Sequence, residues 1–164
     1  MALSEVNAMA SAGFVSAFGD VAEHSAWVAE RAAEHRPFAS REAMIEAFCA
    51  AVRSASHDEK LALIRAHPDL ATRARLTQDS SREQKGAGLD TLTEMELARL
   101  TDLNAHYRQL FGFPFIFAVK GADKHQILAG FEERLCHSPE AEFDIAIAHI
   151  CRILRFRIED RVAP

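Results

Sequence analysis

The sequence has little of what marks disulfide-stapled or membrane-spanning proteins. Its three cysteines, at positions 49, 136 and 151, are odd in number, and no two have C-x-x-C spacing. A disulfide framework therefore does not fit, whereas a reduced cytosol does. No apolar run approaches the roughly 20 residues of a transmembrane helix. Because the first ten residues also lack the basic start of a signal peptide, we expect a cytoplasmic protein with no membrane partner.

Motifs for metals, nucleotides and nucleic acids are also missing. The eight histidines are scattered, with no H-E-x-x-H motif and no pair spaced i, i+4. Neither the G-x-S-x-G elbow of hydrolases nor a GxxxxGK[ST] phosphate loop occurs. The net charge of −5 disfavours the positive surface that nucleic acids bind. We therefore expect no metal site and no nucleic-acid partner.

What the chain does contain predicts an all-α fold, a compact single-domain bundle of roughly eight or more helices over residues 1–164. Glycine is scarce, with 7 residues, and apolar residues recur with helical periodicity almost everywhere. Ser56 with Glu59 and Thr93 with Glu96 have capping-box spacing, and Gly112 is placed to end a helix. We expect helices over about 3–10, 11–18, 21–34, 40–54, 56–66, 68–75, 80–87, 93–111, 123–135 and 138–160.

One segment, Phe113–Val119, does not read as helical. It is apolar and aromatic, and Pro114 interrupts it. One interpretation is a buried loop that fills the core. The other is a binding loop, because a buried non-helical backbone has N–H and C=O groups without ladder partners. Such groups can bind a flat, amide-rich heterocycle.

His67 is the first candidate for chemistry. It ends a predicted helix and precedes Pro68, which disfavours a helical backbone at His67. A neutral imidazole projecting from a helix end can take or give a proton near pH 7. The alternative is a histidine that caps the helix or binds a nearby carboxylate.

The segment Ser80-Ser-Arg-Glu-Gln84 is the second candidate. Ser80 and Glu83 have S-x-x-E spacing, so the pair can simply cap a helix. A helix N-terminus also binds anionic ligands. Glu83 adds a hydrogen-bond acceptor and Gln84 an amide, and both can form hydrogen bonds with a polar ring.

Arg157 is the third candidate. On a helical wheel it lies in the middle of the apolar face of the last helix, with Ala146, Ile150 and Leu154. A guanidinium on a buried face needs a partner. That partner is either a protein carboxylate or a carboxylate or carbonyl of a ligand.

Taken together, four segments resemble the signatures of one family, the 2-oxo-4-hydroxy-4-carboxy-5-ureidoimidazoline (OHCU) decarboxylases. The order and spacing of all four agree with that family, over nearly the whole chain. The segments are His67-Pro-Asp-Leu-Ala71, Ser80-Ser-Arg-Glu-Gln-Lys-Gly-Ala-Gly-Leu89, Phe111-Gly-Phe-Pro-Phe-Ile116 and Ile150-Cys-Arg-Ile-Leu-Arg-Phe-Arg-Ile158.

The resemblance implies an all-α homodimer that converts OHCU, a product of urate oxidation, to (S)-allantoin without a metal or organic cofactor. It implies that the enzyme acts in urate breakdown alongside urate oxidase and hydroxyisourate hydrolase. It gives His67 the part of catalytic acid and makes Glu83 a ligand-binding residue, which we expect either near the departing carboxylate or bonded to a ring N–H. The implied substrate-binding residues are Pro68, Ser80, Ser81, Arg82, Glu83, Gln84, Phe115, Ile116, Phe117, Ala118, Val119 and Arg157.

The chemistry of such a substrate explains why no cofactor would be needed. The electrons released with CO2 can move into the neighbouring C=N bond, so the substrate is its own electron sink. The protein must hold the ring and deliver one proton, and Asp69 either orients His67 for this step or caps the next helix. Two other readings stay open, namely a non-catalytic helical interaction module and a cofactor-free lyase or isomerase acting on a related ureide or hydantoin.

Overall fold

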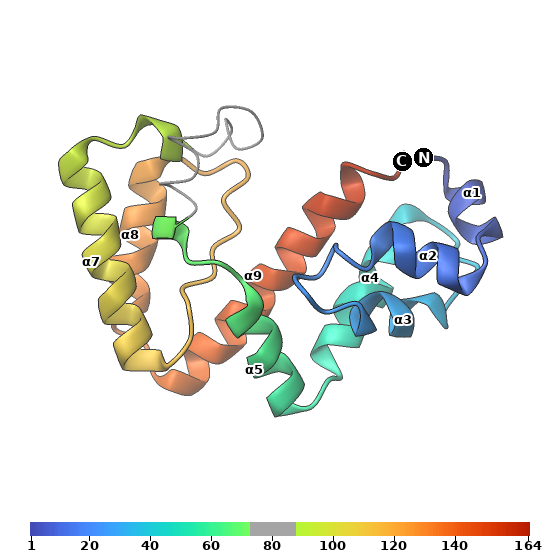
Figure 1. Cartoon of the computed structure of the whole chain (residues 1–164), viewed down its shortest axis with the longest axis horizontal. Coiled ribbons are helices and arrows are strands. Elements are labelled where there is room, and N and C mark those ends of the chain that lie inside the picture. The colour runs from blue at the N-terminus through green and yellow to red at the C-terminus, as the bar shows by residue number, and fades with distance from the viewer. Residues whose placement is uncertain (73–87) are drawn as a thin grey trace. The chain divides into compact units, whose positions relative to one another are not determined.

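The computed structural model describes residues 1–72 and 88–164 (Figure 1). Their regular structure is entirely helical, which confirms the predicted all-α class. The described α-helices are α1 (Leu3–Ala8), α2 (Ser11–Phe18), α3 (Trp27–Ala33), α4 (Arg41–Arg53), α5 (His57–Ala66), α7 (Glu94–Phe111), α8 (Lys124–Arg134) and α9 (Pro139–Glu159), and a 3₁₀ helix, η1, covers Leu89–Thr91. None of these helices is long and apolar enough to cross a membrane.

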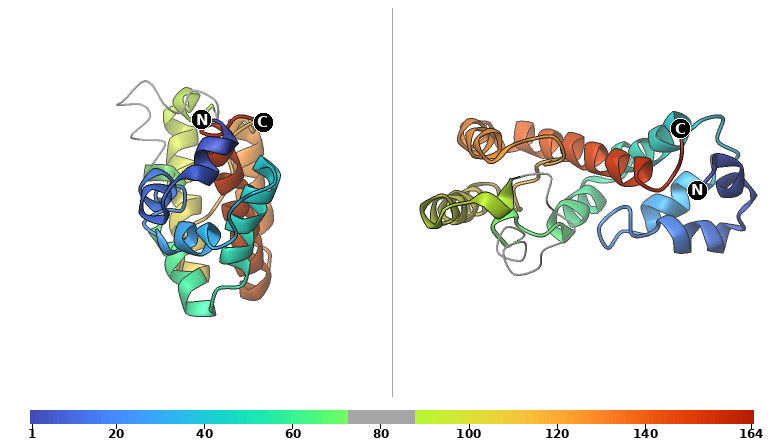
Figure 2. Two further views of the ribbon diagram at one scale, coloured as in Figure 1. Left: turned by 90° about the vertical axis from the view of Figure 1, so that its right-hand side faces the viewer. Right: turned by 90° about the horizontal axis from the view of Figure 1, so that it is seen from above.

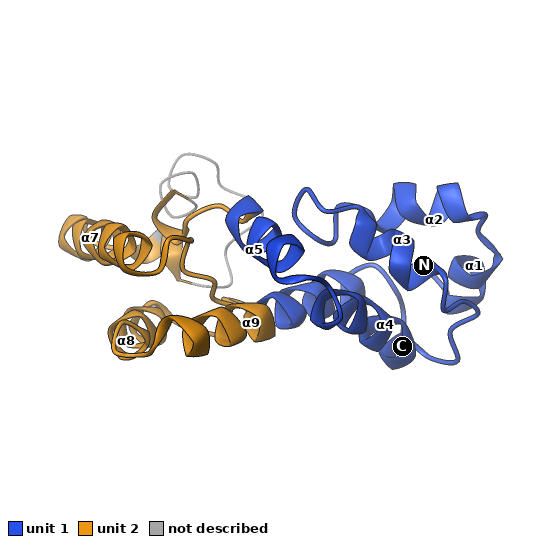
Figure 3. Cartoon of the chain, turned by 90° about the horizontal axis from the view of Figure 1, so that it is seen from below, with its two compact units in different colours: residues 1–66, 150–164 blue, residues 67–149 orange. Residues whose placement is uncertain are grey.

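The chain divides into two compact units (Figure 3). Unit 1 consists of Met1–Ala66 and Ile150–Pro164, and unit 2 of His67–His149. The long helix α9 therefore contributes its first half to unit 2 and its second half to unit 1. That the whole chain forms one domain stays a prediction.

Unit 1 is built around an aromatic core. The Phe14 ring lies 5.0 Å from the Phe18 ring and 6.0 Å from the Phe48 ring, centroid to centroid, and all three side chains are buried. The two ends of the chain meet in this unit, as Figure 1 shows. The N-terminal amine of Met1 donates to the carbonyl of Arg161, and the amide of Ala163 donates back to the Met1 carbonyl.

The helix ends follow the capping signals of the sequence. Thr93 and Glu96 form the predicted capping box of α7, and Ser56 and Glu59 exchange the same two hydrogen bonds at the start of α5. Gly112 ends α7 with a left-handed φ of 75°, a conformation that glycine adopts without steric cost. These local signals therefore place helix boundaries correctly.

The start of α3 differs from the prediction. Helical periodicity suggested a helix from Val21, whereas α3 begins at Trp27. His24 has a left-handed φ of 46°, which no α-helix tolerates. The Val21 carbonyl accepts a hydrogen bond from Arg157 instead of from a later residue of its own segment. Tertiary contacts therefore override the local pattern over these residues.

In unit 2, α7 and α8 run in the same direction, so the chain between them must return along their length (Figures 1 and 2). The 11 residues of α8 span roughly 16 Å at about 1.5 Å per residue. An extended chain covers that distance with about five residues at roughly 3.3 Å each. The connection contains Phe113–Val119, which has no regular helix or strand, as predicted.

Candidate functional site

The predicted proton donor His67 lies at the first position of unit 2, directly after α5. Its side chain is buried, with 5% of its surface exposed, while the following Pro68 is exposed. Leu70 and Ala71 are buried as well. The imidazole of His67 is therefore sheltered from solvent, although the residue that follows it is exposed.

Asp69 links this segment to α7 through an ion pair. Its Oδ2 atom lies 2.8 Å from Nη1 of Arg108. The aspartate side chain is 16% exposed and the arginine side chain 51% exposed. The structure gives Asp69 an ion pair with Arg108, and the expected part in orienting His67 or capping the next helix stays a prediction.

The second motif lies outside the described residues. It comprises Ser80, Ser81, Arg82, Glu83 and Gln84. The roles expected of these residues, including Glu83 near the departing carboxylate or at a ring N–H, stay predictions.

The predicted ring-binding segment, Phe115–Val119, is largely buried. Phe115, Ile116 and Ala118 each have at most 2% of their surface exposed. Two of its peptide groups bind side chains of unit 2. The carbonyl of Ile116 accepts from Nη1 of Arg134 at 2.5 Å, and the amide of Ala118 donates to Nδ1 of His149 at 3.0 Å.

Arg134 belongs to a buried polar cluster that the sequence reasoning missed. Its Nε lies 3.0 and 3.2 Å from the two carboxylate oxygens of Glu142, and Nη2 lies 2.9 Å from Oε2. Tyr107 donates its hydroxyl to the same carboxylate, and Nδ1 of His137 lies 2.8 Å from Oε1. Glu142 and Tyr107 are completely buried, and Arg134 is 5% exposed.

The electrostatics of this cluster favour a charged Glu142. Burial by itself raises the pKa of a carboxyl group, but the hydrogen bonds from Arg134 and Tyr107 outweigh it and hold the pKa of Glu142 below its ordinary 4.5. Burial, and then the hydrogen bond to Glu142, raise the pKa of the Tyr107 hydroxyl. Because a carboxylate can only accept, Nδ1 of His137 donates to it. The cluster is therefore a buried salt bridge between Arg134 and Glu142, to which Tyr107 and His137 add hydrogen bonds.

Aromatic contacts also hold the Phe115–Val119 segment in place. The guanidinium of Arg134 lies over the Phe115 ring at 4.4 Å, and the Phe117 ring stacks on His149 at a centroid distance of 5.0 Å. Gly130 of α8 allows this approach, because a Cβ at Gly130 would lie 2.9 Å from the Phe117 ring. The segment is thus held by side-chain stacking as well as by hydrogen bonds.

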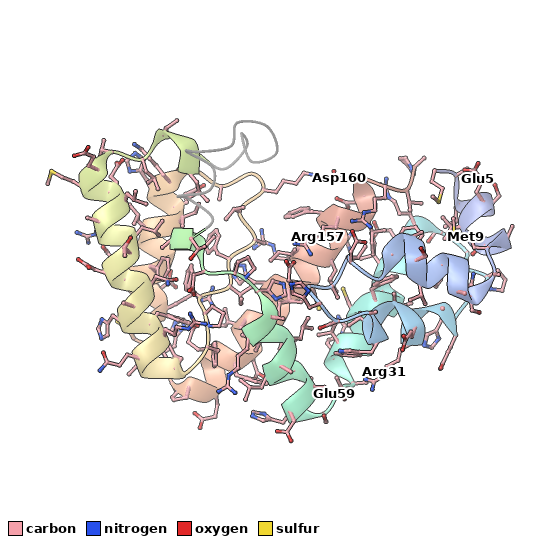
Figure 4. All side chains as sticks on the ribbon, in the orientation of Figure 1. Glu5, Met9, Arg31, Glu59, Arg157 and Asp160 are labelled. Atoms are coloured by element: carbon pink, nitrogen blue, oxygen red, sulfur yellow. The ribbon has the colours of Figure 1, made fainter. Side chains whose placement is uncertain are left out.

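Arg157 lies in unit 1, on the second half of α9 (Figure 4). Its Nη2 pairs with Glu23 at 2.8 Å, and its Nη1 donates to the Val21 carbonyl at 2.8 Å. The side chain is half-buried, with 26% of its surface exposed. Of the two partners that the sequence left open, the structure shows the protein carboxylate; a part in ligand binding stays a prediction.

A signal for the missed cluster was present in the sequence. Glu142 lies four residues before Ala146 and eight before Ile150, so it falls on the same buried stripe of α9 as Arg157. A second charged residue on that stripe also needed a buried partner. Its partners come from α7 and α8, which no local pattern identifies.

Comparisons with known proteins give the family. Residues 7–159 match the family model described as OHCU decarboxylase. The 2-oxo-4-hydroxy-4-carboxy-5-ureidoimidazoline decarboxylase of Haloferax volcanii is 42% identical over 98% of this chain and 96% of its own length. A uric acid degradation bifunctional protein of a Bacillus species is 40% identical over 98% of this chain, which spans 32% of that protein. A crystal structure of (S)-allantoin synthase is 34% identical, with a TM-score of 0.82 over 99% of this chain and 54% of the other. The resemblance of the four motifs is thereby confirmed, and this chain belongs to the OHCU decarboxylase family.

Proposed function

We propose that this protein decarboxylates OHCU to (S)-allantoin, with His67 handling the proton. The observation that carries the proposal is the near full-length similarity to a curated OHCU decarboxylase, at 42% identity. The buried position of His67 and the hydrogen-bonded segment Phe115–Val119 support it. Both belong to unit 2.

The proposed reaction balances without an added cofactor. The bond between the ring carbon and its carboxylate breaks, CO2 leaves, and the electron pair moves into the neighbouring C=N bond. His67 then supplies or relays the proton, at the hydroxyl or at the new stereocentre. Positioned proton transfer of this kind contributes about 10²–10⁴-fold to a rate. In this proposal the backbone of Phe115–Val119 orients the ring, and Glu83 acts either near the departing carboxylate or by binding a ring N–H.

The first experiment follows the stereochemistry of the product. OHCU is generated from urate with urate oxidase and hydroxyisourate hydrolase, and circular dichroism records the allantoin formed with and without this protein. Fast appearance of an (S)-allantoin signal only with the protein supports the proposal. Slow, racemic product in both samples, from a protein that is shown to be folded, refutes it.

The His67→Ala variant tests the proton donor. We expect turnover to fall at least 100-fold, because positioned proton transfer is lost while the fold is kept. His106→Ala is the matched control, because His106 is an exposed histidine of the same unit. Activity of His67→Ala close to that of the control would remove His67 from the mechanism.

The Arg157→Lys variant tests the binding role that the resemblance gives to Arg157. A lysine keeps the charge but cannot replace the planar fork, so we expect binding of (S)-allantoin to weaken about tenfold or more. Glu23→Gln separates the two roles, because it removes the charged partner of Arg157 but leaves the guanidinium and its hydrogen bond to the Val21 carbonyl in place. Unchanged affinity in Arg157→Lys would leave the ion pair with Glu23 as its function.

The assembly and setting of the enzyme are proposals too. We propose a homodimer in the cytoplasm that works alongside urate oxidase and hydroxyisourate hydrolase. The three cysteines are unbridged, which fits a reduced compartment, and relatives named for uric acid degradation fit the pathway. Light scattering after size exclusion tests the dimer, and a monomer at micromolar concentration would contradict it.

A further inference from the structure

The connection between α7 and α8 has two unlike backbone edges. In an extended chain, the N–H and C=O of one residue point to the same edge, and those of the next residue to the opposite edge. Ile116 and Ala118 are two residues apart, so their groups share an edge. Side chains of unit 2 bind this edge: Arg134 donates to the Ile116 carbonyl, and His149 accepts from the Ala118 amide.

The groups of Phe115, Phe117 and Val119 belong to the other edge. Among the described residues, the amides of these three residues donate to no protein acceptor, and the carbonyls of Phe115 and Phe117 accept from no protein donor. The Val119 carbonyl accepts from the amide of Ala122 at 3.0 Å. This edge therefore offers alternating donors and acceptors to a ligand.

We propose that Arg134 and His149 are positioning residues, which fasten one edge of Phe115–Val119 so that the opposite edge binds the cyclic urea of the substrate. This inference rests on the proposed function and names residues that act through the backbone. A ring with alternating N–H and C=O groups matches the alternating groups of Phe115, Phe117 and Val119.

The two positioning residues are themselves held in place. Glu142 receives three contacts of 3.2 Å or less from Arg134, which fixes the plane of the guanidinium that reaches the Ile116 carbonyl. His149 stacks on Phe117, and its Nδ1 accepts the Ala118 amide, so that ring nitrogen carries no proton. The binding edge is thus arranged before a ligand arrives, which lowers the entropy lost on binding.

The experiment replaces His149 in two ways. His149→Phe keeps a ring beside Phe117 but removes the acceptor. His149→Asn restores an acceptor, because the amide oxygen can take the place of Nδ1. Three quantities are measured for each variant and the wild type: KM and kcat with OHCU, the dissociation constant of (S)-allantoin by calorimetry, and hydrogen exchange of the Ala118 amide by NMR.

For His149→Phe we expect the dissociation constant and KM to rise about tenfold, while kcat changes less than about threefold. The reason is that Phe115–Val119 loses roughly one hydrogen bond that orders its backbone. Exchange of the Ala118 amide should accelerate at least about tenfold over the wild type. His149→Asn should recover most of the affinity and most of the protection. A purely structural histidine would instead lower the melting temperature and kcat, with no recovery by asparagine.

Arg134→Lys is the second variant, because one ammonium group cannot bind Glu142 in the same way and also reach the Ile116 carbonyl. We expect the same rise in KM for this variant. Wild-type affinity in His149→Phe, or unchanged exchange at Ala118, would overturn the positioning role. If the wild-type protein neither converts OHCU nor binds (S)-allantoin, the proposed function fails, while amide exchange still reports whether His149 holds the segment.

Discussion

The buried carboxylate of Glu142 allows a sharp prediction about stability. Glu142→Gln preserves the size of the side chain but removes its charge. The guanidinium of Arg134, 5% exposed, is then left as a buried cation without its counter-ion. Removing one partner of a buried ion pair destabilises a protein by about 3–5 kcal/mol. Because the glutamine oxygen still accepts some of the hydrogen bonds, we expect a loss of about 3 kcal/mol at pH 7.

The sign of the pH dependence follows from the lowered pKa of Glu142. A carboxyl group whose pKa is depressed by folding stabilises the native state above its unfolded value, here 4.5, and this contribution is lost as the pH falls through the lower folded value. The difference in unfolding free energy between wild type and Glu142→Gln should therefore be largest near pH 7. It should shrink as the pH falls below about 4.5.

Urea unfolding, followed by far-UV circular dichroism at several pH values, measures this difference. Glu140→Gln is the control, because Glu140 is an exposed acid in the same first turn of α9. Tyr107→Phe is a milder variant, which removes one hydrogen bond to the carboxylate and should cost about 1–2 kcal/mol. Equal, small losses in Glu142→Gln and Glu140→Gln, or a difference that does not change with pH, would refute this account of the cluster.

Two further predictions concern glycines and a surface carboxylate. The Cβ of Gly13→Ala in α2 meets open space, so this variant should raise the unfolding free energy in urea by up to about 1 kcal/mol. Gly130→Ala brings a Cβ to 2.9 Å from the Phe117 ring and should give no such gain. Equal gains in the two variants would show that the Phe117 ring moves freely. Hydrogen bonds from Lys124 and from the Thr93 backbone lower the pKa of Glu96 to about 2, so its NMR titration should have a midpoint there and move toward 4.5 in Lys124→Ala. A wild-type midpoint near 4.5 would contradict the contact between Glu96 and Lys124.

Much of this protein was determined by the sequence itself. Local capping signals such as Thr93 with Glu96, and a left-handed glycine at Gly112, depend on neighbouring residues only, so helix ends could be predicted from them. The irregular Phe113–Val119 segment followed from its aromatic, proline-interrupted composition. The motifs beginning at His67 and continuing to Arg157 identified the family through their order and spacing, and the match of residues 7–159 to the family model agrees with them.

The tertiary structure decided what lies far apart along the chain. The start of α3 was mispredicted, because the Val21 carbonyl is bound by Arg157, more than 130 residues later. The cluster of Arg134 and Glu142 could not be predicted for the same physical reason. A charged residue on a buried helix face indicates that a partner is needed, but the identity of that partner depends on how the helices pack. Which edge of Phe115–Val119 is bound by Arg134 and His149 is likewise a property of the packed helices and not of the segment's own residues.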